Sequence, residues 1–424
     1  MSASSDQVYY SVDQFGISKR DLETIWQTYF RSHHAVQVHG RVRSFAKDRV
    51  GYLGDHFMLV LESSECSESS VELFLKVLPS GIPALTDYLH SIGTARKESN
   101  MYRELLPKMG QFSRFAPQCF LALEPAGQLL VLENLHVQGF RNIPNESAGI
   151  FDKEHLKCAL VALAKYHSAS LLLEKETGES LIVLAPGVLE ENAWVRKENN
   201  PRVKELDNAI DVLLAMVRMI EKDNPQLIAI LEKLPKFMQQ IYELVKPSSV
   251  YRNVACHGDL WSNNMMFRYT AVDGRSIPLE CLIIDYQFTR YAPPAYDLNM
   301  LITLTTTGHF RRIHREELIR FYYQRVLEEL KCHHLDCDLP GELNEESFYK
   351  SCETYKISGL IDNFLMNHVT LLPRDYVNKI FSSAECYNSF SGESKIKMCL
   401  EVLENDKVYR ERIIGIIRDL IEVI

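Results

Sequence analysis

Two stretches of the sequence hold most of the information about its architecture: HGDLWSNN at residues 257–264 and LIIDYQ at residues 282–287. The first places Asp259 and Asn264 five positions apart on a predicted loop, and in the second an apolar strand ends at Asp285. Mg²⁺ takes oxygen ligands, and a carboxylate beside a hydroxyl can orient it and accept its proton. An ordinary turn followed by a carboxylate at a strand end is the alternative interpretation. Three such groups in this order, each at a loop or strand end, favour a catalytic site.

The spacing of Asp259 and Asn264 is that of the Asp and Asn in the kinase catalytic loop H-R-D-x-x-x-x-N. Kinases keep a metal-binding Asp at the end of a strand that follows a hairpin, and this sequence has Asp285 there. Phosphoryl transfer depends on positioning and charge neutralisation more than on covalent help. We therefore predict Asp259 as the catalytic residue and Asn264 and Asp285 as ligands of Mg²⁺.

The chain before about residue 135 has the pattern of a mixed α/β unit. The apolar, partly alternating segments 55–61 and 71–78 predict a β-hairpin, and 129–132 predicts another strand. Between them, residues 92–106 predict a helix that stops at Pro107.

After residue 150 the pattern becomes helical. Two short strands, near 253–257 and 279–285, are the exception, and they flank a predicted turn at Asp273-Gly274. A small mixed lobe followed by a larger helical lobe with an embedded hairpin is therefore expected. The segments with apolar residues at helical spacing are 155–173, 203–220, 225–245, 315–331 and 395–422.

Composition excludes several classes of protein. The 424 residues include 47 Lys and Arg against 56 Asp and Glu, a net charge of −9, which argues against nucleic-acid binding as the main function. The ten cysteines have no framework spacing, which indicates a reducing compartment. The polar start of the chain lacks the apolar core of a signal peptide, and no stretch approaches the roughly 18 uninterrupted apolar residues that a spanning helix needs. We expect a cytoplasmic protein without a membrane partner.

The chain resembles the ecdysteroid kinase-like family, also called CHK kinase-like, a branch of the group that includes aminoglycoside phosphotransferases and choline kinases. The resemblance rests on HGDLWSNN, LIIDYQ and YDL (296–298), and it extends from about Asp55 to Leu301. It implies an α+β, protein-kinase-like bilobal fold, with an antiparallel sheet and one helix in the small lobe and a large, mostly helical second lobe. The expected units are an N-terminal nucleotide-binding lobe with a helical extension, 1–135, and a catalytic and substrate-binding lobe, 136–424.

The resemblance also assigns residues that would bind the nucleotide. Lys76 in LFLKVLP (73–79) matches the lysine that contacts phosphate, and Glu98 in KESNMY (97–102) matches its partner. Glu133 and Leu135 in VLENL (131–135) match the segment joining the lobes, where backbone groups meet the base of ATP. The residues support Lys76 independently, because a lysine in an apolar strand is costly to bury unless it is paired. An edge-strand lysine that points to water is the alternative.

Other positions have supporting roles or depart from the family pattern. His257 is expected to brace the catalytic loop through backbone hydrogen bonds. Asp297 is expected to brace the same loop, or else to cap a helix. Gln287 is expected to reach metal-bound water, or to hydrogen-bond locally. Gly54 aligns with the glycine of the family's phosphate loop, but His56, Phe57 and Leu59 replace the Asn, Tyr and Ser expected after it.

The motifs also restrict the substrate. Gly258 replaces the Arg of H-R-D, and the stretch between Asp285 and Asp297 is short and lacks A-P-E, so an activation-loop switch and a docked peptide are not expected. The resemblance implies a small-molecule alcohol, such as an ecdysteroid or another lipophilic xenobiotic, with no obligate protein partner. The main alternative is a catalytically weak pseudokinase that acts as a ligand-binding or regulatory module. The CHHLDC segment at 332–337 is expected to be a polar loop rather than a zinc site.

Overall fold

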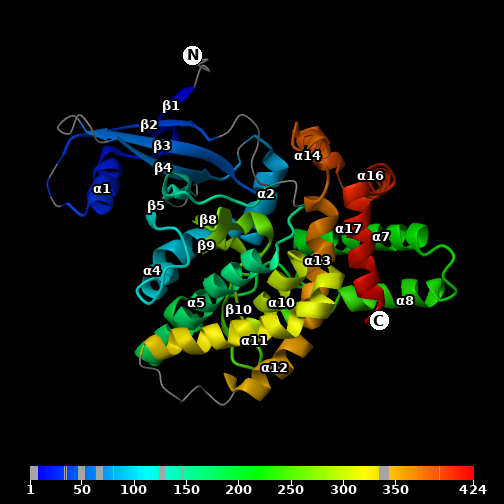
Figure 1. Ribbon diagram of the computed structural model, residues 1–424. Helices are drawn as coiled ribbons and strands as arrows, with labels where there is room; N and C mark the ends of the chain where they lie inside the picture. Colours follow the sequence, from blue (N-terminus) through cyan, green and yellow to red (C-terminus); the bar gives the residue numbers. More distant parts are fainter. Residues whose placement is uncertain are drawn as a thin grey trace.

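The computed structural model has a small lobe built on an antiparallel sheet and a larger, mostly helical lobe (Figure 1). This architecture confirms the expected α+β fold, with an antiparallel sheet in the small lobe and a mostly helical second lobe. The structure describes residues 8–32, 34, 36–45, 53–63, 70–79, 81–123, 129–144, 148–333, 343–390 and 392–424.

The sheet of the small lobe has six strands in the order β1-β2-β3-β4-β6-β5, with every neighbouring pair antiparallel. The predicted hairpin is the β3–β4 pair, in which Phe57 lies opposite Leu75. β4 pairs with both β3 and β6, so Lys76 lies on an inner strand and the edge-strand alternative is wrong. The strands are β1 (Tyr9–Ser11), β2 (Val38–Ser44), β3 (Asp55–Ser63), β4 (Ser70–Val77), β5 (Cys119–Leu123) and β6 (Leu129–Leu132).

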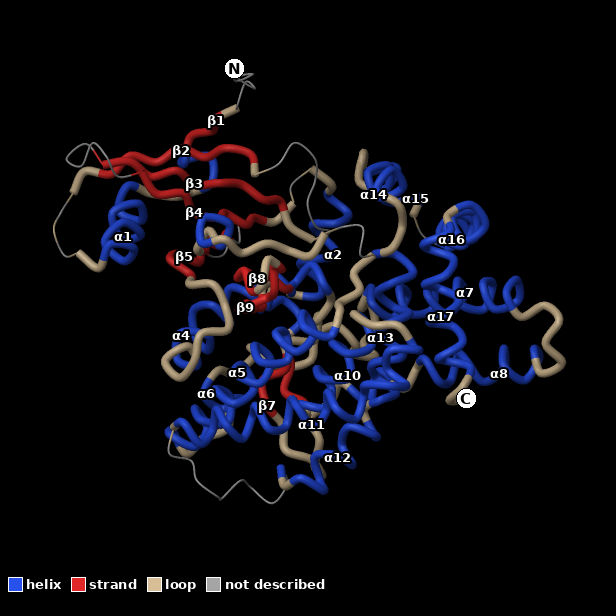
Figure 2. The backbone as a smooth tube through the Cα atoms, viewed as in Figure 1, coloured by secondary structure: helices blue, strands red, loops and turns tan. Residues whose placement is uncertain are grey.

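One face of this sheet is covered by α1 (Lys19–Phe30), as Figures 1 and 2 show. Ser18 begins the helix with a capping box, in which its hydroxyl accepts the Asp21 N–H and the Asp21 carboxylate accepts the Ser18 N–H. The alternation of β4 directs Val71, Leu73 and Leu75 into the core shared with α1, and therefore turns Lys76 toward the opposite face. The predicted N-terminal extension is more than helical, because β1 and β2 also belong to this sheet.

The helix predicted to stop at Pro107 continues past it. α2 (Pro83–Ile92) is followed by α3 (Thr94–Asn100), a π-helical turn (Met101–Leu105) and α4 (Leu106–Met109). The N–H of Leu106 reaches the carbonyl of Met101 across the wide π turn. This turn changes the hydrogen-bonding register just before Pro107 and places the proline in the first turn of α4. The N–H groups of a first turn have no partner within their helix, so the N–H that proline lacks does not end the helical path.

The large lobe contains most of the helices (Figure 2). Two predicted helices are broken in the structure: 225–245 divides near Gln239, and 395–422 divides at Asp406, whose side chain caps the second part by accepting the Tyr409 N–H. The helices are α5 (Lys153–Thr177), α6 (Leu181–Leu184), α7 (Pro201–Ile220), α8 (Leu227–Met238), α9 (Ile241–Leu244), α10 (Pro294–Leu304), α11 (Gly308–Cys332), α12 (Glu345–Thr354), α13 (Lys356–Thr370), α14 (Arg374–Ile380), α15 (Ala384–Ser389), α16 (Gly392–Asn405) and α17 (Lys407–Ile421).

The embedded strands pair differently from the prediction. The turn at Asp273 and Gly274, both at positive φ, joins β8 (Met265–Val272) to β9 (Arg275–Ile283). The earlier strand, β7 (Val254–Cys256), pairs instead with β10 (Arg290–Ala292). The two pairs together bring the catalytic loop at 257–264 next to the end of β9, where Asp285 follows.

α5 is the central helix of the large lobe. Within the described part of the chain it is the one helix with the length and composition to cross a membrane, and 78% of the relevant window is buried inside the protein. It packs against α11, β7 and β9, so its apolar surface forms the core of this lobe.

Candidate active site

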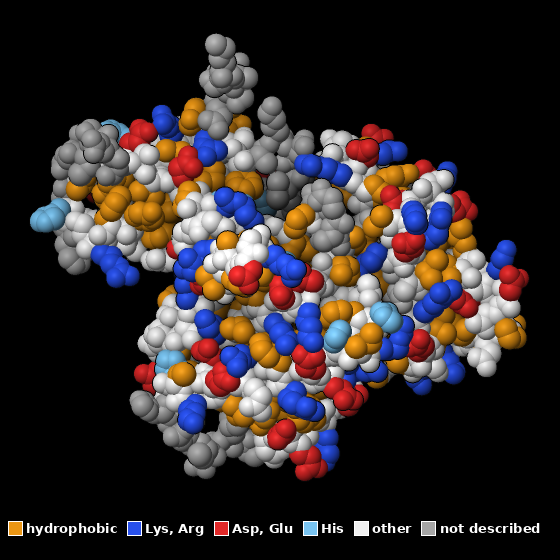
Figure 3. Space-filling view, in the orientation of Figure 1, with side chains coloured by type: hydrophobic (Ala, Val, Ile, Leu, Met, Phe, Trp, Pro, Cys, Tyr) orange, Lys and Arg blue, Asp and Glu red, His pale blue; other side chains and the backbone are white. Residues whose placement is uncertain are grey.

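A cleft of about 1000 Å³ lies between the two lobes and contains the predicted site residues. Lys76, Asp259 and Asp285 line it, together with Asn264 and Glu98. On the face of the molecule in Figure 3, acidic and basic side chains are interspersed and do not form one basic area. The five polar residues thus meet in one cleft although they come from four separate segments of the chain.

Lys76 connects the two lobes. Its Nζ lies 2.7 Å from Oε2 of Glu98 on α3 and 2.6 Å from Oδ1 of Asp285 after β9. Burial would lower the pKa of Lys76, but the charges of Asp285 and Glu98 outweigh it and raise that pKa above its usual value. Lys76 therefore remains a cation at neutral pH, suited to contact a phosphate group.

The catalytic loop is held by Asp297 on α10. Its carboxylate accepts the N–H of His257 at 2.5 Å and the N–H of Gly258 at 2.9 Å. Asp297 is the fourth residue of α10 and therefore lies inside the helix, not at its cap. This position agrees with the expected bracing role and not with the helix-cap alternative.

His257 fixes the loop against the strand end. Its Nε2 lies 3.0 Å from the carbonyl of Ile284, and its Nδ1 accepts the N–H of Asp259 at 3.3 Å. Burial lowers the pKa of His257, so the imidazole is neutral and donates from Nε2. The ring thus holds Asp259 and the residue before Asp285 at a fixed separation, as the predicted bracing role requires.

Gly258 has a conformation that the arginine of H-R-D could not adopt without strain. Its φ is +76°, and a Cβ there would lie 2.4 Å from the carbonyl oxygen of Phe288 and 3.1 Å from Nε of Arg290. Arg290 is 2% exposed and pairs with Glu191 at 3.0 Å. The guanidinium of Arg290, on β10, therefore fills the space behind the catalytic loop.

Asp259 and Asn264 are joined directly. Nδ2 of Asn264 donates to Oδ2 of Asp259 at 2.8 Å and to its backbone carbonyl at 2.9 Å. Burial, followed by the charge of Asp285, raises the pKa of Asp259 to about 8. Because the amide nitrogen is engaged with Asp259, the amide oxygen of Asn264 is the group that remains for a metal.

The donor set at this position fits Mg²⁺. Asn264 offers its amide oxygen and Asp285 offers the carboxylate oxygen that does not face Lys76, both of them hard ligands. Asp285 is a non-glycine residue at φ +73°, a backbone conformation that costs energy and is typical of functional sites. Gln287, two residues later, is buried and lines the same cleft, consistent with either of its expected roles.

Glu133 and Leu135 line the cleft where the lobes join. The side chain of Glu133 accepts hydrogen bonds from Arg114 and Gln138 and from the backbone of Gln118, so it stabilises the connecting segment. Leu135 begins a short 3-10 helix, and its carbonyl accepts the N–H of Phe140.

The structure describes only part of the predicted phosphate loop. A Cβ on Gly54 would lie 3.2 Å from both Nε2 of His56 and Cε of Lys76, so the glycine allows the strand to pass close to this lysine. The first two residues of the predicted loop segment, 51 and 52, lie outside the described residues. So does most of the 332–337 segment: of its six residues, 332 and 333 are described.

Four rings to which the sequence assigned no binding role line one end of the cleft. The ring of Phe74 lies 5.3 Å from Phe45 and 5.2 Å from His56, and Phe45 lies 5.6 Å from His136. His56 occupies the position where the family has Asn, so this departure contributes a ring to an aromatic cluster. The pairing of β2, β3 and β4, together with the 3-10 helix that follows β6, brings these residues together, which is why sequence spacing could not find them.

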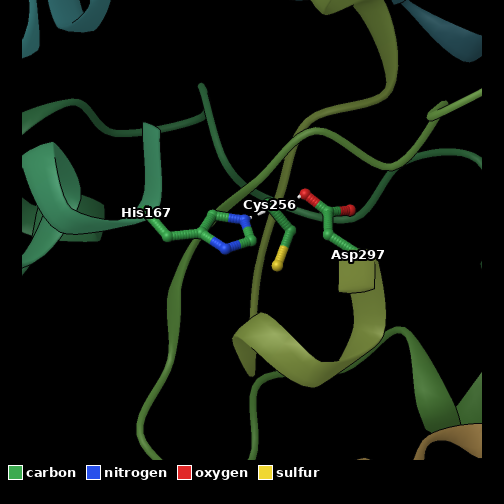
Figure 4. Close-up of side chains that lie close together, drawn as sticks. All are labelled: His167, Cys256 and Asp297. Carbon is green, nitrogen blue, oxygen red and sulfur yellow. Dashed lines mark hydrogen bonds and ion pairs between the residues drawn. The ribbon is translucent and has the colours of Figure 1, made fainter. Parts of the chain in front are cut away.

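A second group of potential ligands lies behind the catalytic loop: His167, Cys256 and Asp297, all buried (Figure 4). His167 contacts Asp297 at 3.1 Å and the hydroxyl of Tyr322 at 2.6 Å, and the Cys256 thiol donates to the carbonyl of Ala292 at 3.3 Å. Burial keeps the pKa of Cys256 far above that of a free thiol. With their polar atoms satisfied by protein groups, these residues form a structural support for Asp297.

Comparison with known proteins gives one family. The profile of the ecdysteroid kinase-like family (EcKL) matches residues 52–335. No curated protein sequence matches the chain. Among solved structures, the chain is similar to APH(2″)-IIa, whose structure is a ternary complex with streptomycin and ATP. The identity is 16%, the match covers 88% of this chain and 97% of that chain, and the TM-score is 0.36. It is also similar to a glucosamine kinase, with 11% identity, coverage of 90% and 93%, and a TM-score of 0.28.

Proposed function

The chain belongs to the ecdysteroid kinase-like family, and from that premise we propose that it is an ATP- and Mg²⁺-dependent kinase that phosphorylates a hydroxyl of a small lipophilic alcohol, such as an ecdysteroid or a xenobiotic. The observation that carries the proposal is the ammonium group of Lys76, held between Glu98 and Asp285 in the cleft that also contains Asp259 and Asn264. These are the groups that phosphoryl transfer requires.

Each residue has a role that follows from its position. Lys76 contacts the phosphates, and Glu98 holds Lys76 in place. Asn264 and Asp285 hold Mg²⁺, which neutralises charge on the phosphates when it is bound. Asp259, on the fixed catalytic loop, orients the acceptor hydroxyl and, in its ionised form, accepts the proton. Because its pKa is raised to about 8, this form becomes more populated as the pH rises toward 8.

The two ends of the cleft suit the two substrates. The rings of Phe45, Phe74 and His136 offer faces against which a purine base can stack. The other end is walled by α2, α7 and α13, with Trp194 and Phe288 offering apolar surface to a lipophilic acceptor. The tight fit around Gly258 supports a small-molecule acceptor, because it leaves no arginine to receive a phosphorylated activation loop.

We also propose that the protein is cytoplasmic and that it acts without a nucleic-acid, membrane or obligate protein partner. The absence of a single-sign charged area on the face in Figure 3 and the buried position of α5 support it.

The decisive experiment combines turnover with one substitution. The protein is incubated with Mg²⁺-ATP and a panel of ecdysteroids and plant or drug alcohols, and mass spectrometry detects products with one added phosphate. Asp259→Asn should lower kcat by about 10²- to 10⁴-fold and leave nucleotide affinity nearly unchanged. Asp87→Asn is the matched control, because Asp87 is an exposed carboxylate at the rim of the same cleft.

A different outcome would favour the second candidate, a catalytically weak pseudokinase. The motivation for this candidate is that His56, Phe57 and Leu59 stand where the family has Asn, Tyr and Ser in its phosphate loop. If the wild type and Asp259→Asn give equal turnover while both bind nucleotide or alcohol, the protein is a binding module.

A further inference from the structure

A small cavity lies beside the pair of Lys76 and Glu98, between α3 and the sheet of the small lobe. Its volume is about 20 Å³, and Lys76, Glu98 and Gln287 line both this cavity and the large cleft. Thr94 and Ser99 line the cavity but not the cleft. The ion pair therefore borders a second, much smaller space. The rest of the cavity wall is apolar and comes from Leu53, Val77, Leu78, Ala95 and Leu130.

Two hydroxyl groups of α3 belong to the wall of this cavity. Thr94 and Glu98 are four residues apart and therefore lie on one face of the helix, and Ser99 follows directly. Thr94 is 1% exposed and Ser99 is 0% exposed. Neither Oγ1 of Thr94 nor Oγ of Ser99 has a hydrogen-bond partner among the described residues. Buried hydroxyls are normally hydrogen-bonded, so both require a partner from outside the described chain.

One oxygen of Glu98 has the same requirement. Its Oε2 accepts a hydrogen bond from Lys76 at 2.7 Å. Its Oε1 is buried and lacks a hydrogen-bond partner among the described residues, although the backbone N–H of Tyr286 faces the carboxylate and helps to lower its pKa. Burial raises the pKa of Glu98, so the ionised form depends on the donors around it. A donor at Oε1 would strengthen the charge that holds Lys76.

Size and chemistry restrict what can satisfy these three atoms. A polar cavity needs about 10–15 Å³ of this kind of volume to hold one water molecule, so about 20 Å³ admits one water and nothing much larger. Water can donate to the Glu98 carboxylate and exchange hydrogen bonds with both hydroxyls. A monovalent cation would lie close to the ammonium group of Lys76, and an anion would lie close to the carboxylate, so charge repulsion opposes both. The amide of Gln287, which is 4% exposed, completes the polar part of the wall.

We propose that one water molecule is a fixed part of the site, bound by the hydroxyls of Thr94 and Ser99 and donating to Oε1 of Glu98. Thr94 and Ser99 are then positioning residues, because they act through the water on the carboxylate that holds Lys76. The positioning role rests on the proposed function, in which Lys76 binds the phosphates of the nucleotide. The water site itself does not depend on that function.

The first test is the sign of a stability change. Thr94→Val replaces the hydroxyl with a methyl group of similar size. Loss of a hydrogen bond to bound water should lower the midpoint of thermal unfolding by about 1–2 °C, whereas removal of an unpaired buried hydroxyl would raise it. Thr24→Val, at an exposed threonine of α1, is the matched control and should leave the midpoint near that of the wild type. A raised or unchanged midpoint in Thr94→Val would overturn the proposal.

A crystal structure at a resolution that shows ordered water tests the site directly. The wild type should have one density peak within hydrogen-bond distance of Oγ1 of Thr94, Oγ of Ser99 and Oε1 of Glu98. The same peak should be lost in Thr94→Val. An empty cavity in the wild type would refute the water site, and so would an anomalous signal at the peak after a soak in Tl⁺, which would identify a monovalent cation.

Calorimetry with Mg²⁺ and a non-hydrolysable ATP analogue tests the positioning role. Thr94→Val and Ser99→Ala should each weaken binding about threefold to tenfold, less than the loss of a direct hydrogen bond to a charged group. Thr94→Ser keeps the hydroxyl and should bind the analogue nearly as well as the wild type. A Thr94→Val variant that is less stable but binds normally would show a structural role alone and would overturn the positioning role.

These outcomes distinguish the inference from the proposed function. Density in the cavity of a wild type that binds no ATP analogue leaves the water site standing and refutes the kinase function. Nucleotide binding and phosphate transfer that are unchanged in both Thr94→Val and Ser99→Ala support the kinase and refute the positioning role.

Discussion

Asp285 shows how much can depend on one side chain. One of its oxygens accepts a hydrogen bond from Lys76 at 2.6 Å, and the other is the strongest candidate ligand for Mg²⁺. The residue therefore carries two charge interactions that join the lobes, at a backbone φ of +73° that few non-glycine residues adopt. Asp259, by contrast, contacts Asn264 and lines the cleft.

The first prediction separates these two carboxylates. Asp285→Asn should weaken binding of the Mg²⁺-nucleotide by about tenfold to hundredfold, because the metal and Lys76 both lose a charged partner. Titration calorimetry at several Mg²⁺ concentrations measures this effect, with Asp259→Asn as the control that keeps near wild-type affinity. An unchanged Mg²⁺ dependence in Asp285→Asn would contradict the assignment.

The second prediction concerns acid stability. His368 has a pKa of about 3 in the folded protein, with Lys395 and Glu205 facing it, against about 6.5 when unfolded. Between these values the unfolded chain binds the proton first, so stability falls as the pH drops below about 6.5. For this group the loss between pH 7 and pH 5 is about 2 kcal/mol. Urea unfolding should show that His368→Gln loses this share of the pH dependence, and parallel wild-type and variant curves would refute it.

At the scale of single elements, the catalytic loop depends on a glycine with positive φ. Gly258→Ala should destabilise the protein by more than the about 1 kcal/mol that such a backbone conformation costs alone, because the new Cβ would collide with the carbonyl of Phe288. Gly274→Ala is the matched control, since Gly274 has φ +74° with open space around it. Chemical denaturation of both variants measures the difference, and equal losses would show that the close approach has no effect.

Helix α3 is tied to the large lobe by the residue beside Glu98. The ammonium of Lys97 donates to the carbonyls of Glu190 and Thr289, at 2.5 and 2.7 Å, and to the side chain of Asn192 at 2.8 Å. These bonds anchor α3, and with it Glu98, to the large lobe.

Lys97→Met should therefore loosen the pair of Lys76 and Glu98 and raise KM for ATP by several-fold. Lys108→Met, an exposed lysine on α4, should leave KM unchanged. Steady-state kinetics at fixed acceptor concentration test this prediction. A variant that loses stability but keeps its KM would show that Lys97 only supports the fold.

At the scale of the whole molecule, the sequence was most informative where function restricts spacing. The separation of Asp259 and Asn264 and the strand before Asp285 were enough to predict one shared cleft, and the structure brings these residues together. Local turn chemistry at Asp273-Gly274 was also correct. The partner of the strand at 254–256 was wrong, because β10 lies more than thirty residues further along and no local pattern specifies such a pairing.

The cleft walls were beyond prediction for the same reason. Lys395 and His368 lie on separate helices, and nothing in their local sequence distinguishes them from surface residues. Both side chains reach the cleft only when α16 packs against α7 and α17, and α13 packs against α10 and α17. Burial, which is a property of the folded chain, turns two unremarkable side chains into part of the cleft wall.

The arginine behind the catalytic loop has a consequence for control of the protein. Arg290 is enclosed by Glu191 and Tyr296, with its guanidinium 2.6 Å from the tyrosine hydroxyl, and it permanently fills the space behind Gly258. A phosphorylated loop that needs a cationic partner behind the catalytic loop would find Arg290 already paired with Glu191 and Tyr296. We therefore expect that phosphorylation of the segment between Asp285 and Asp297 does not switch the protein on.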